Sequence, residues 1–229
     1  KGYRIRLPID VYLIASANPE DYTNRGRIIT PLKDRYGSQI RTHYPIYPDQ
    51  EVAIMEQEIH LAADMKEKLV VPKFMKDIIA EVTMFARNSG EINQRSGVSV
   101  RVSIANYESV LSSAYKRSIK LNEDVASPRI TDLSSLIPST IGKIELEALE
   151  EGQDVRVMED IIKKAVLKIF NEHLKDDEEL DELLSQFEEG LTLEASHNHP
   201  LSSYSDELKK IKPLEEAMSK LEESNTPAT

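Results

Sequence analysis

The residues of this sequence best suited to chemistry are an asparagine and three arginines within the first 41 positions. Asn18 follows an apolar run, Val11–Ala15, and Arg27, Arg35 and Arg41 come after it. A side-chain amide both donates and accepts hydrogen bonds, so Asn18 could orient a water molecule towards a phosphate group. A guanidinium is always charged and meets phosphate oxygens with a planar fork of donors. These residue types suit phosphoryl-transfer chemistry, with Asn18 as its first candidate residue.

A further arginine, Arg101, stands in the run Gly97-Val98-Ser99-Val100-Arg101-Val102-Ser103-Ile104, near the expected start of a helix. The free N–H groups and the positive dipole end at such a start favour anions. Simpler interpretations stand beside these. Arg101 would be an ordinary solvent-facing helix residue, and Asp34 and Arg35 would form a surface ion pair worth at most about 1 kcal/mol. Asn18 would merely turn the chain before a proline.

The sequence has no phosphate-binding loop of the G-x-x-x-x-G-K-[ST] type. Such a loop needs two glycines five positions apart, followed by Lys and then Ser or Thr, so that several backbone N–H groups close around phosphate. Gly142 is the glycine that precedes a lysine, but Ile144 follows and Ile137 occupies the first glycine position. No apolar strand ending in Asp-Glu is present to hold magnesium either. We therefore expect that the chain alone does not hydrolyse ATP.

Three segments occur in the order found in the later half of an AAA+ ATPase core. They are Asn18 after its apolar run, Leu32-Lys33-Asp34-Arg35-Tyr36-Gly37, and Gly97–Ile104. Over about residues 7–135 the chain resembles the branch that contains the magnesium-chelatase ATPase subunit and the MoxR-type ATPases. Two departures are Tyr36, where the family has phenylalanine, and Val100, where it often has proline. Nothing similar is evident in residues 151–229.

The resemblance implies a role for each candidate residue. Asn18 corresponds to the first sensor, and Arg35 to the arginine finger that reaches the ATP of the adjacent subunit. Arg101 corresponds to the second sensor, which contacts the nucleotide phosphates of its own subunit. Arg41 and Arg27 are the rivals of Arg35 or share its role.

The resemblance also implies a function for the full-length protein. ATP and Mg²⁺ would be bound in a ring of identical subunits, and hydrolysis would remodel a partner or help insert a metal or cofactor. The family's usual partner carries a von Willebrand factor A-like domain. The chain begins at Lys1 rather than Met, so we interpret it as a fragment that binds no nucleotide tightly by itself. The alternative is a non-catalytic helical adaptor that recruits another protein through the apolar helix Met158–Phe170 and an acidic tail.

Charge and composition limit the other function classes. The net charge is −11, and residues 151–229 carry 20 acidic and 9 basic side chains, whereas residues 1–150 are balanced. An acidic tail disfavours nucleic acid, whose binding needs clustered Lys and Arg. No apolar run has the length of a membrane span, and the absence of cysteine suits a reducing compartment, so we expect a cytoplasmic protein. No metal site is predicted, because His197 and His199 have no third ligand at convincing spacing.

The expected fold is mainly α with a small α/β remnant. Residues 1–48 would be the end of the αβα core, with a strand at Val11–Ala15 covered on both faces and an edge strand at Ile40–Pro48. Residues 49–150 would form the helical lid, and residues 151–229 an acidic helical extension beyond a boundary at Gly152.

Apolar residues recur with a helical period from Asp49 onwards, which is a plausible N-cap. Pro72 would open the second helix and Asn88-Ser89-Gly90 would end it. The expected helices are Val52–Met65, Lys73–Arg87, Ser99–Ile119, Thr131–Ile144 with a break at Pro138, Met158–His173, Leu180–Phe187 and Leu208–Leu221, the last two separated by a polar segment at residues 192–206.

Overall fold

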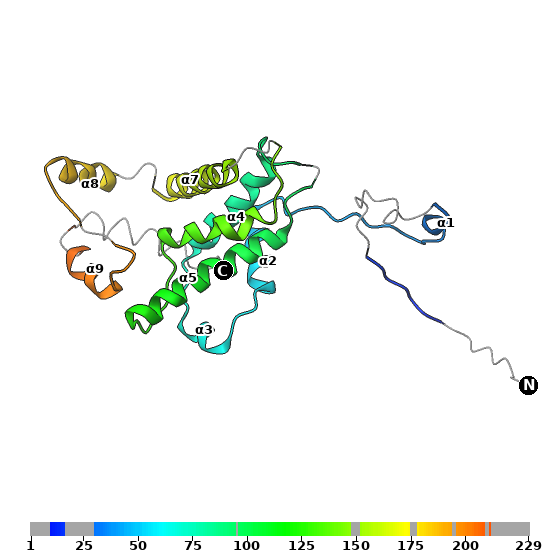
Figure 1. Cartoon of the computed structure of the whole chain (residues 1–229), viewed down its shortest axis with the longest axis horizontal. Coiled ribbons are helices and arrows are strands. Elements are labelled where there is room, and N and C mark those ends of the chain that lie inside the picture. Colours follow the sequence, from blue (N-terminus) through cyan, green and yellow to red (C-terminus); the bar gives the residue numbers. More distant parts are fainter. Residues whose placement is uncertain are drawn as a thin grey trace, which may run out of the picture. The chain divides into compact units, whose positions relative to one another are not determined.

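The structure of this chain is a computed structural model. It describes residues 10–16, 30–94, 96–147, 152–174, 178–193, 196–208 and 211. The chain divides into two compact units, Lys1–His43 and Tyr44–Thr229. The expectation of a mainly α fold is confirmed, because helices dominate both the ribbon and the residue assignments (Figure 1).

The first unit does not form the strand that its sequence predicts. In the described part of this unit the regular element is the short helix α1, Thr30–Lys33, and residues 10–16 adopt neither helix nor strand. Val11, Leu13 and Ile14 are 72–83 % exposed. The prediction of a strand covered on both faces is therefore wrong for this chain. A buried parallel strand is stable only between neighbouring strands and beneath covering helices, and the described residues supply neither.

The predicted edge strand at Ile40–Pro48 is also not formed. Residues 40–45 have no regular structure, and Pro48 is already the first residue of a helix. Among the described residues the extended pairings are two isolated bridges, Leu69 with Ala126 and Ile92 with Leu146, rather than strands.

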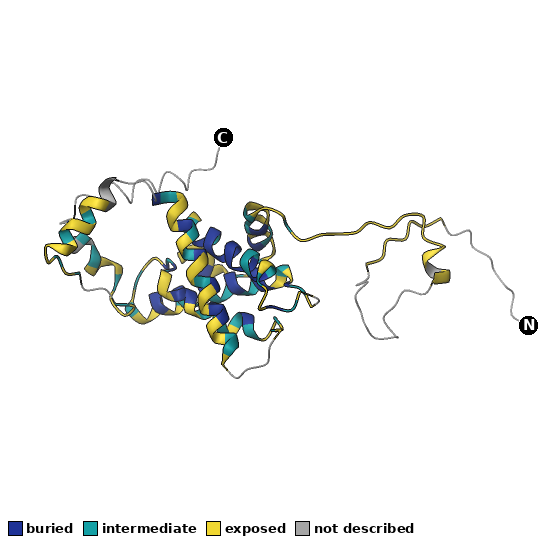
Figure 2. Ribbon diagram, turned by 90° about the horizontal axis from the view of Figure 1, so that it is seen from above, coloured by how far each residue is buried: buried dark blue, intermediate teal, exposed yellow. Residues whose placement is uncertain are grey.

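The second unit is a bundle built around two long helices. Helix α4 packs against α2, α5 and α7, and α5 also packs against α6 and a 3₁₀ helix, η1. Figure 2 shows the buried residues gathered where these helices meet. The elements are α2 (Pro48–Glu58), α3 (Ala63–Lys68), α4 (Lys73–Asn88), α5 (Val100–Leu121), η1 (Ile130–Ser135), α6 (Leu136–Ile141), α7 (Gln153–Leu174), α8 (Glu178–Glu188) and α9 (Leu201–Leu208).

The first predicted helix of the bundle is split in two. Helix α2 ends at Glu58, and α3 begins only at Ala63. Between them, Ile59 and Leu61 are partly buried against the core. The predicted cap at Asp49 is also wrong: Tyr47 is the N-cap residue and Pro48 the first helical residue, a position that tolerates its missing N–H. The side chain of Gln50 reaches back and accepts hydrogen bonds from the N–H groups of Ile46 and Tyr47.

The next two helices lie close to their predicted positions. Helix α4 follows Pro72 and ends at Asn88. Helix α5 begins after Ser99 and ends at Leu121, and the left-handed backbone of the C-cap residue Asn122 (φ 55°) is typical of a helix C-terminus. The predicted Thr131–Ile144 helix is instead η1 followed by α6, and Pro138 lies in the first turn of α6, where no backbone donor is required.

Helix α7 belongs to the same core as the helices before it. Met158, Ile161 and Ala165 are at most 3 % exposed and pack in one hydrophobic cluster with α4. The predicted boundary near residue 150 stays a prediction, although α7, which follows it, packs in the same core as α4. Helix α8 contains the predicted Leu180–Phe187, whereas α9 occupies part of the segment predicted as a polar linker. Nearly all of the predicted Leu208–Leu221 helix lies outside the described residues.

Across the described helices, no stretch combines the length and the hydrophobicity needed to cross a bilayer.

The pH dependence of stability gives a first test of this core. Tyr107 of α5 is 5 % exposed, and its burial, with the Glu56 carboxylate as the second cause, raises its pKa to about 12 from 10.0. The unfolded chain therefore ionises this phenol more easily than the folded chain does. Its stabilising contribution is complete below pH 10 and is lost as the pH rises through about 12. We expect the free energy of unfolding to fall less steeply over that range in Tyr107→Phe than in the wild type.

Urea denaturation at stepped pH measures this difference. The control is Tyr12→Phe, because Tyr12 is 89 % exposed and should leave the wild-type slope unchanged. Equal slopes for Tyr107→Phe and the wild type would contradict the burial of this phenol.

Candidate functional site

Arg101 lies in the first turn of α5 with its side chain exposed. The hydroxyl of Ser99 caps this helix by accepting a hydrogen bond from the N–H of Arg101 at 3.3 Å. The guanidinium of Arg101 has no hydrogen bond or ion pair with any residue that the structure describes. A positive side chain at the positive end of a helix dipole is not stabilised by the helix itself. The location is favourable for an anion instead.

Directly inside this helix start lies a buried ion pair between Glu51 of α2 and Arg87 of α4. The two guanidinium nitrogens Nη1 and Nη2 of Arg87 donate to Oε2 and Oε1 of Glu51 at 2.8 and 2.9 Å. The Glu51 side chain is fully buried, and the Arg87 side chain is 9 % exposed. This bidentate ion pair fixes the relative orientation of the two side chains.

Arg87 has a third contact, which reaches the chain just before α5. Its Nε donates to the carbonyl oxygen of Val98 at 2.9 Å. Val98 is fully buried and immediately precedes the capping residue Ser99. The same guanidinium therefore links α2, α4 and the entry to α5.

Helix α5 contacts the ion pair from its other side. The hydroxyl of Ser103 donates to Oε1 of Glu51 and lies 3.0 Å from the hydroxyl of Thr83. Both hydroxyl residues are fully buried. Ser103 is two residues after Arg101, which is about 200° around an α-helix, so a buried Ser103 leaves Arg101 on the outer face.

Gly97 and Tyr44 complete the surroundings of this loop. Gly97 has a positive φ of 68°, a conformation that residues with a side chain rarely adopt. A Cβ added to Gly97 would lie 2.7 Å from the Tyr44 hydroxyl oxygen. The Tyr44 ring in turn lies under the guanidinium of Arg87, at 4.6 Å from its centroid. The backbone conformation therefore favours glycine at position 97, and a larger residue there would also displace the end of the Tyr44 side chain.

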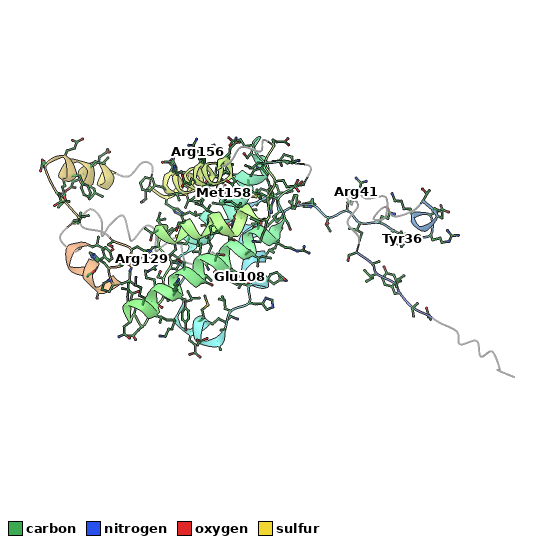
Figure 3. The ribbon with its side chains drawn as sticks, in the orientation of Figure 1. Tyr36, Arg41, Glu108, Arg129, Arg156 and Met158 are labelled. Atoms are coloured by element: carbon green, nitrogen blue, oxygen red, sulfur yellow. The ribbon has the colours of Figure 1, made fainter. Side chains whose placement is uncertain are left out.

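The residues predicted in the first unit are described less completely. Arg35 follows α1, is exposed, and donates from Nη1 to the carbonyl oxygen of Pro31. The structure shows no ion pair between Asp34 and Arg35. Arg41 is exposed and lies outside any helix; Figure 3 labels it. Asn18 and Arg27 lie outside the described residues.

These candidates fall in different units of the chain. Arg35 and Arg41 belong to the unit Lys1–His43, and Arg101 belongs to the unit Tyr44–Thr229. Each group of candidates is therefore described within its own unit.

His197 and His199 contact η1 and Arg129, the residue just before it. The hydroxyl of Thr131 lies 2.8 Å from Nδ1 of His197, and Nη1 of Arg129 donates to the carbonyl oxygen of His199 at 2.9 Å. Arg129, which Figure 3 labels, also lies over the ring of Tyr204 in α9. The described part of the chain contains no cluster of three potential metal-binding side chains.

Comparison with known proteins finds no relative of this chain. No protein-family model, no curated protein sequence and no solved structure matches this chain. The functional assignment consequently depends on the residues themselves and on the motifs that they form.

Sequence reasoning missed the ion pair and its contacts. In the sequence, Glu51 lies 36 positions before Arg87 and 52 positions before Ser103. A single sequence does not reveal pairings over such separations. The available signals were weak: Glu51 falls in the first turn of a helix and Arg87 in the last turn of another, where their charges suit the helix dipoles.

Removing the carboxylate should expose the cost of burying this pair. Glu51→Ala leaves the guanidinium of Arg87 buried without its partner, and we expect a loss of about 3–5 kcal/mol in the free energy of unfolding. Guanidinium chloride denaturation measures it. Replacing Arg87 as well, in Glu51→Ala/Arg87→Met, should restore part of the loss because no unpaired charge remains.

Glu159→Ala is the matched control, because the Glu159–Lys163 pair is exposed and should contribute less than about 1 kcal/mol. If Glu51→Ala lowers the free energy of unfolding by no more than this control does, the Glu51–Arg87 pair behaves as a solvent-exposed ion pair and the prediction is wrong.

Proposed function

We propose that this chain carries the sensor, arginine-finger and lid parts of an AAA+ ATPase of the magnesium-chelatase and MoxR-like branch. The observation that supports this most is the state of Arg101. It is exposed, has no partner among the described residues, and lies in the first turn of a 22-residue helix that Ser99 caps. An unpaired guanidinium beside free helix N–H groups suits a polyphosphate.

Each candidate residue would have one task at the ATP site. Arg101 would bind the phosphates held by its own subunit, and Arg35 would reach the ATP of the neighbouring subunit. Asn18 would orient the attacking water, and Arg41 and Arg27 would support Arg35. Guanidinium groups in these places stabilise the charge that develops on the transferred phosphoryl group. The printed sequence has no phosphate loop, so tight binding of ATP and Mg²⁺ is expected in the full-length protein alone.

The proposed protein acts as a ring of identical subunits. ATP binding and hydrolysis would change the angle between the lid, which contains α2 to α6, and the ATPase core. This movement would remodel a partner protein or help insert a metal or cofactor. A protein with a von Willebrand factor A-like domain is the partner that the resemblance favours.

The adaptor alternative receives less support from the structure. It needs the apolar face of residues 158–170 to be free for a partner, but Met158, Ile161, Ala165 and Ile169 are buried within the chain's own core. The apolar side chains that α7 leaves exposed include Leu167 and Phe170, at 59 and 45 %. Leu167 borders a shallow pocket of about 520 Å³ beside Phe85 of α4.

Replacing Arg101 tests the central assignment. In the full-length gene product, Arg101→Ala should lower kcat for ATP by roughly 10²-fold, because a preorganised positive group is lost from the phosphates. Steady-state ATP turnover measures this loss. Lys116→Ala is the control: Lys116 is an exposed cation on the same helix, four turns further along, and should be silent. Wild-type turnover in Arg101→Ala would favour the adaptor.

Mixing subunits tests the contribution of Arg35 to a neighbouring site. When Arg35→Ala subunits of the full-length protein are mixed into wild type, turnover should fall more steeply than simple dilution predicts. Each altered subunit would remove the arginine from its neighbour's ATP site, and because the sites of the proposed ring act together, one impaired site would slow the others as well. A strictly proportional fall would remove the assignment of Arg35 to the neighbour's site.

A further inference from the structure

Hydrogen bonds connect several buried side chains next to the start of α5 and lead towards the exposed Arg101. Glu51, Arg87, Thr83 and Ser103 join three helices, and Arg87 Nε extends the set to the Val98 carbonyl oxygen. Beyond that contact lie Ser99 and then Arg101, whose guanidinium is exposed. This arrangement needs an explanation beyond stability, because a buried ion pair is often no more stabilising than apolar residues of the same size.

We propose that Arg87, held by Glu51, is a positioning residue that presents Arg101 to its phosphate ligand. The inference rests on the proposed function, since it concerns how the same arginine is placed. Arg87 acts through Arg101 and touches no ligand itself.

Two contacts would set the position of Arg101. The bond from Arg87 Nε to the Val98 carbonyl fixes the backbone just before the cap, and therefore fixes where α5 begins. The bond from Ser103 to Glu51 fixes the rotation of α5 about its axis. Start and rotation together determine the direction in which the side chain of Arg101 leaves the helix.

The loop before α5 is shaped to keep this geometry. Gly97 takes a positive φ, and the space for a Cβ there is filled by Tyr44, whose ring packs against Arg87. A shift of Arg87 would therefore disturb its contacts with Tyr44 and the Val98 carbonyl together, and through Val98 the position of the capping residue Ser99. A misplacement of about 1 Å in such a site can cost up to 10²-fold in rate.

The experiment is a double-mutant cycle between Arg87 and Arg101 in the full-length gene product. Arg87→Lys keeps a positive charge for Glu51 but has no Nε donor for Val98 and no planar fork. We expect Arg87→Lys to lower kcat for ATP roughly 10-fold in the wild-type background. In the Arg101→Ala background the same change should have no further effect, because nothing remains for it to position.

Arg117→Lys is the matched control. Arg117 is also buried, donates to Asp132 and to the Ser127 carbonyl, and lies towards the other end of α5. It should lower thermal stability in a similar way, but any loss of turnover should be the same with and without Arg101. Coupling to Arg101 therefore separates positioning from a merely structural role.

Three outcomes would overturn the proposal. If the losses from Arg87→Lys and Arg101→Ala multiply, or if Arg87→Lys leaves turnover unchanged, Arg87 does not position Arg101, and the proposed function survives. If Arg101→Ala itself leaves turnover unchanged, both the proposed function and this inference fail. Should Arg87→Lys not fold, Ser103→Ala replaces it: it removes the hydroxyl that contacts Glu51 and Thr83, and its smaller loss must also vanish in the Arg101→Ala background.

Discussion

The ion pair between Glu51 and Arg87 is the constraint on which the helical unit depends. A fully buried carboxylate must be paired and hydrogen-bonded, so α2 and α4 have to meet where their ends bring these two charges together. Glu51 lies near the positive end of α2 and Arg87 near the negative end of α4, so both helix dipoles support the pair. The start of α5 is then bound to the same point through Ser103 and Val98.

A second buried ion pair, Arg117 with Asp132, holds α5 near its C-terminal end. Arg117 donates to Asp132 of η1, which also accepts from Ser113 and from the N–H of Arg129. Helix α5 is about 33 Å long and is thus held by guanidinium–carboxylate pairs near both ends, with apolar packing between them. These two pairs fix the position of α5 relative to α2, α4 and η1 near both of its ends.

The sequence predicted the elements that depend on local signals. Helices α4 and α5 were found because an apolar period, a proline, an N-capping serine and a terminal Asn-Ser-Gly are all read within a few residues. The strand at Val11–Ala15 was not correct for this chain, because a strand depends on partners that lie elsewhere. The sequence did not predict the split between α2 and α3. Ile59 and Leu61 are apolar residues that contact the core from the connecting segment, but in the sequence they look like part of a continuous helical pattern. Arg101 could be proposed from its motif, but the buried groups behind it depend on long-range pairing that no local pattern contains.

The arginines of the described chain separate into two groups by their partners. Arg87, Arg117 and Arg129 each pair with a carboxylate. Among the described residues, Arg35, Arg41, Arg101 and Arg156 pair with none, although the chain carries 40 acidic side chains against 29 basic ones. Each of these four arginines is exposed, so solvent and external anions can reach it. Arg156, labelled in Figure 3, lies in the first turn of α7, outside the resembled segment, and is exposed. Exposure alone therefore does not identify a phosphate ligand. Arg101 differs from Arg156 because a capped helix start and a buried network define where its charge is placed.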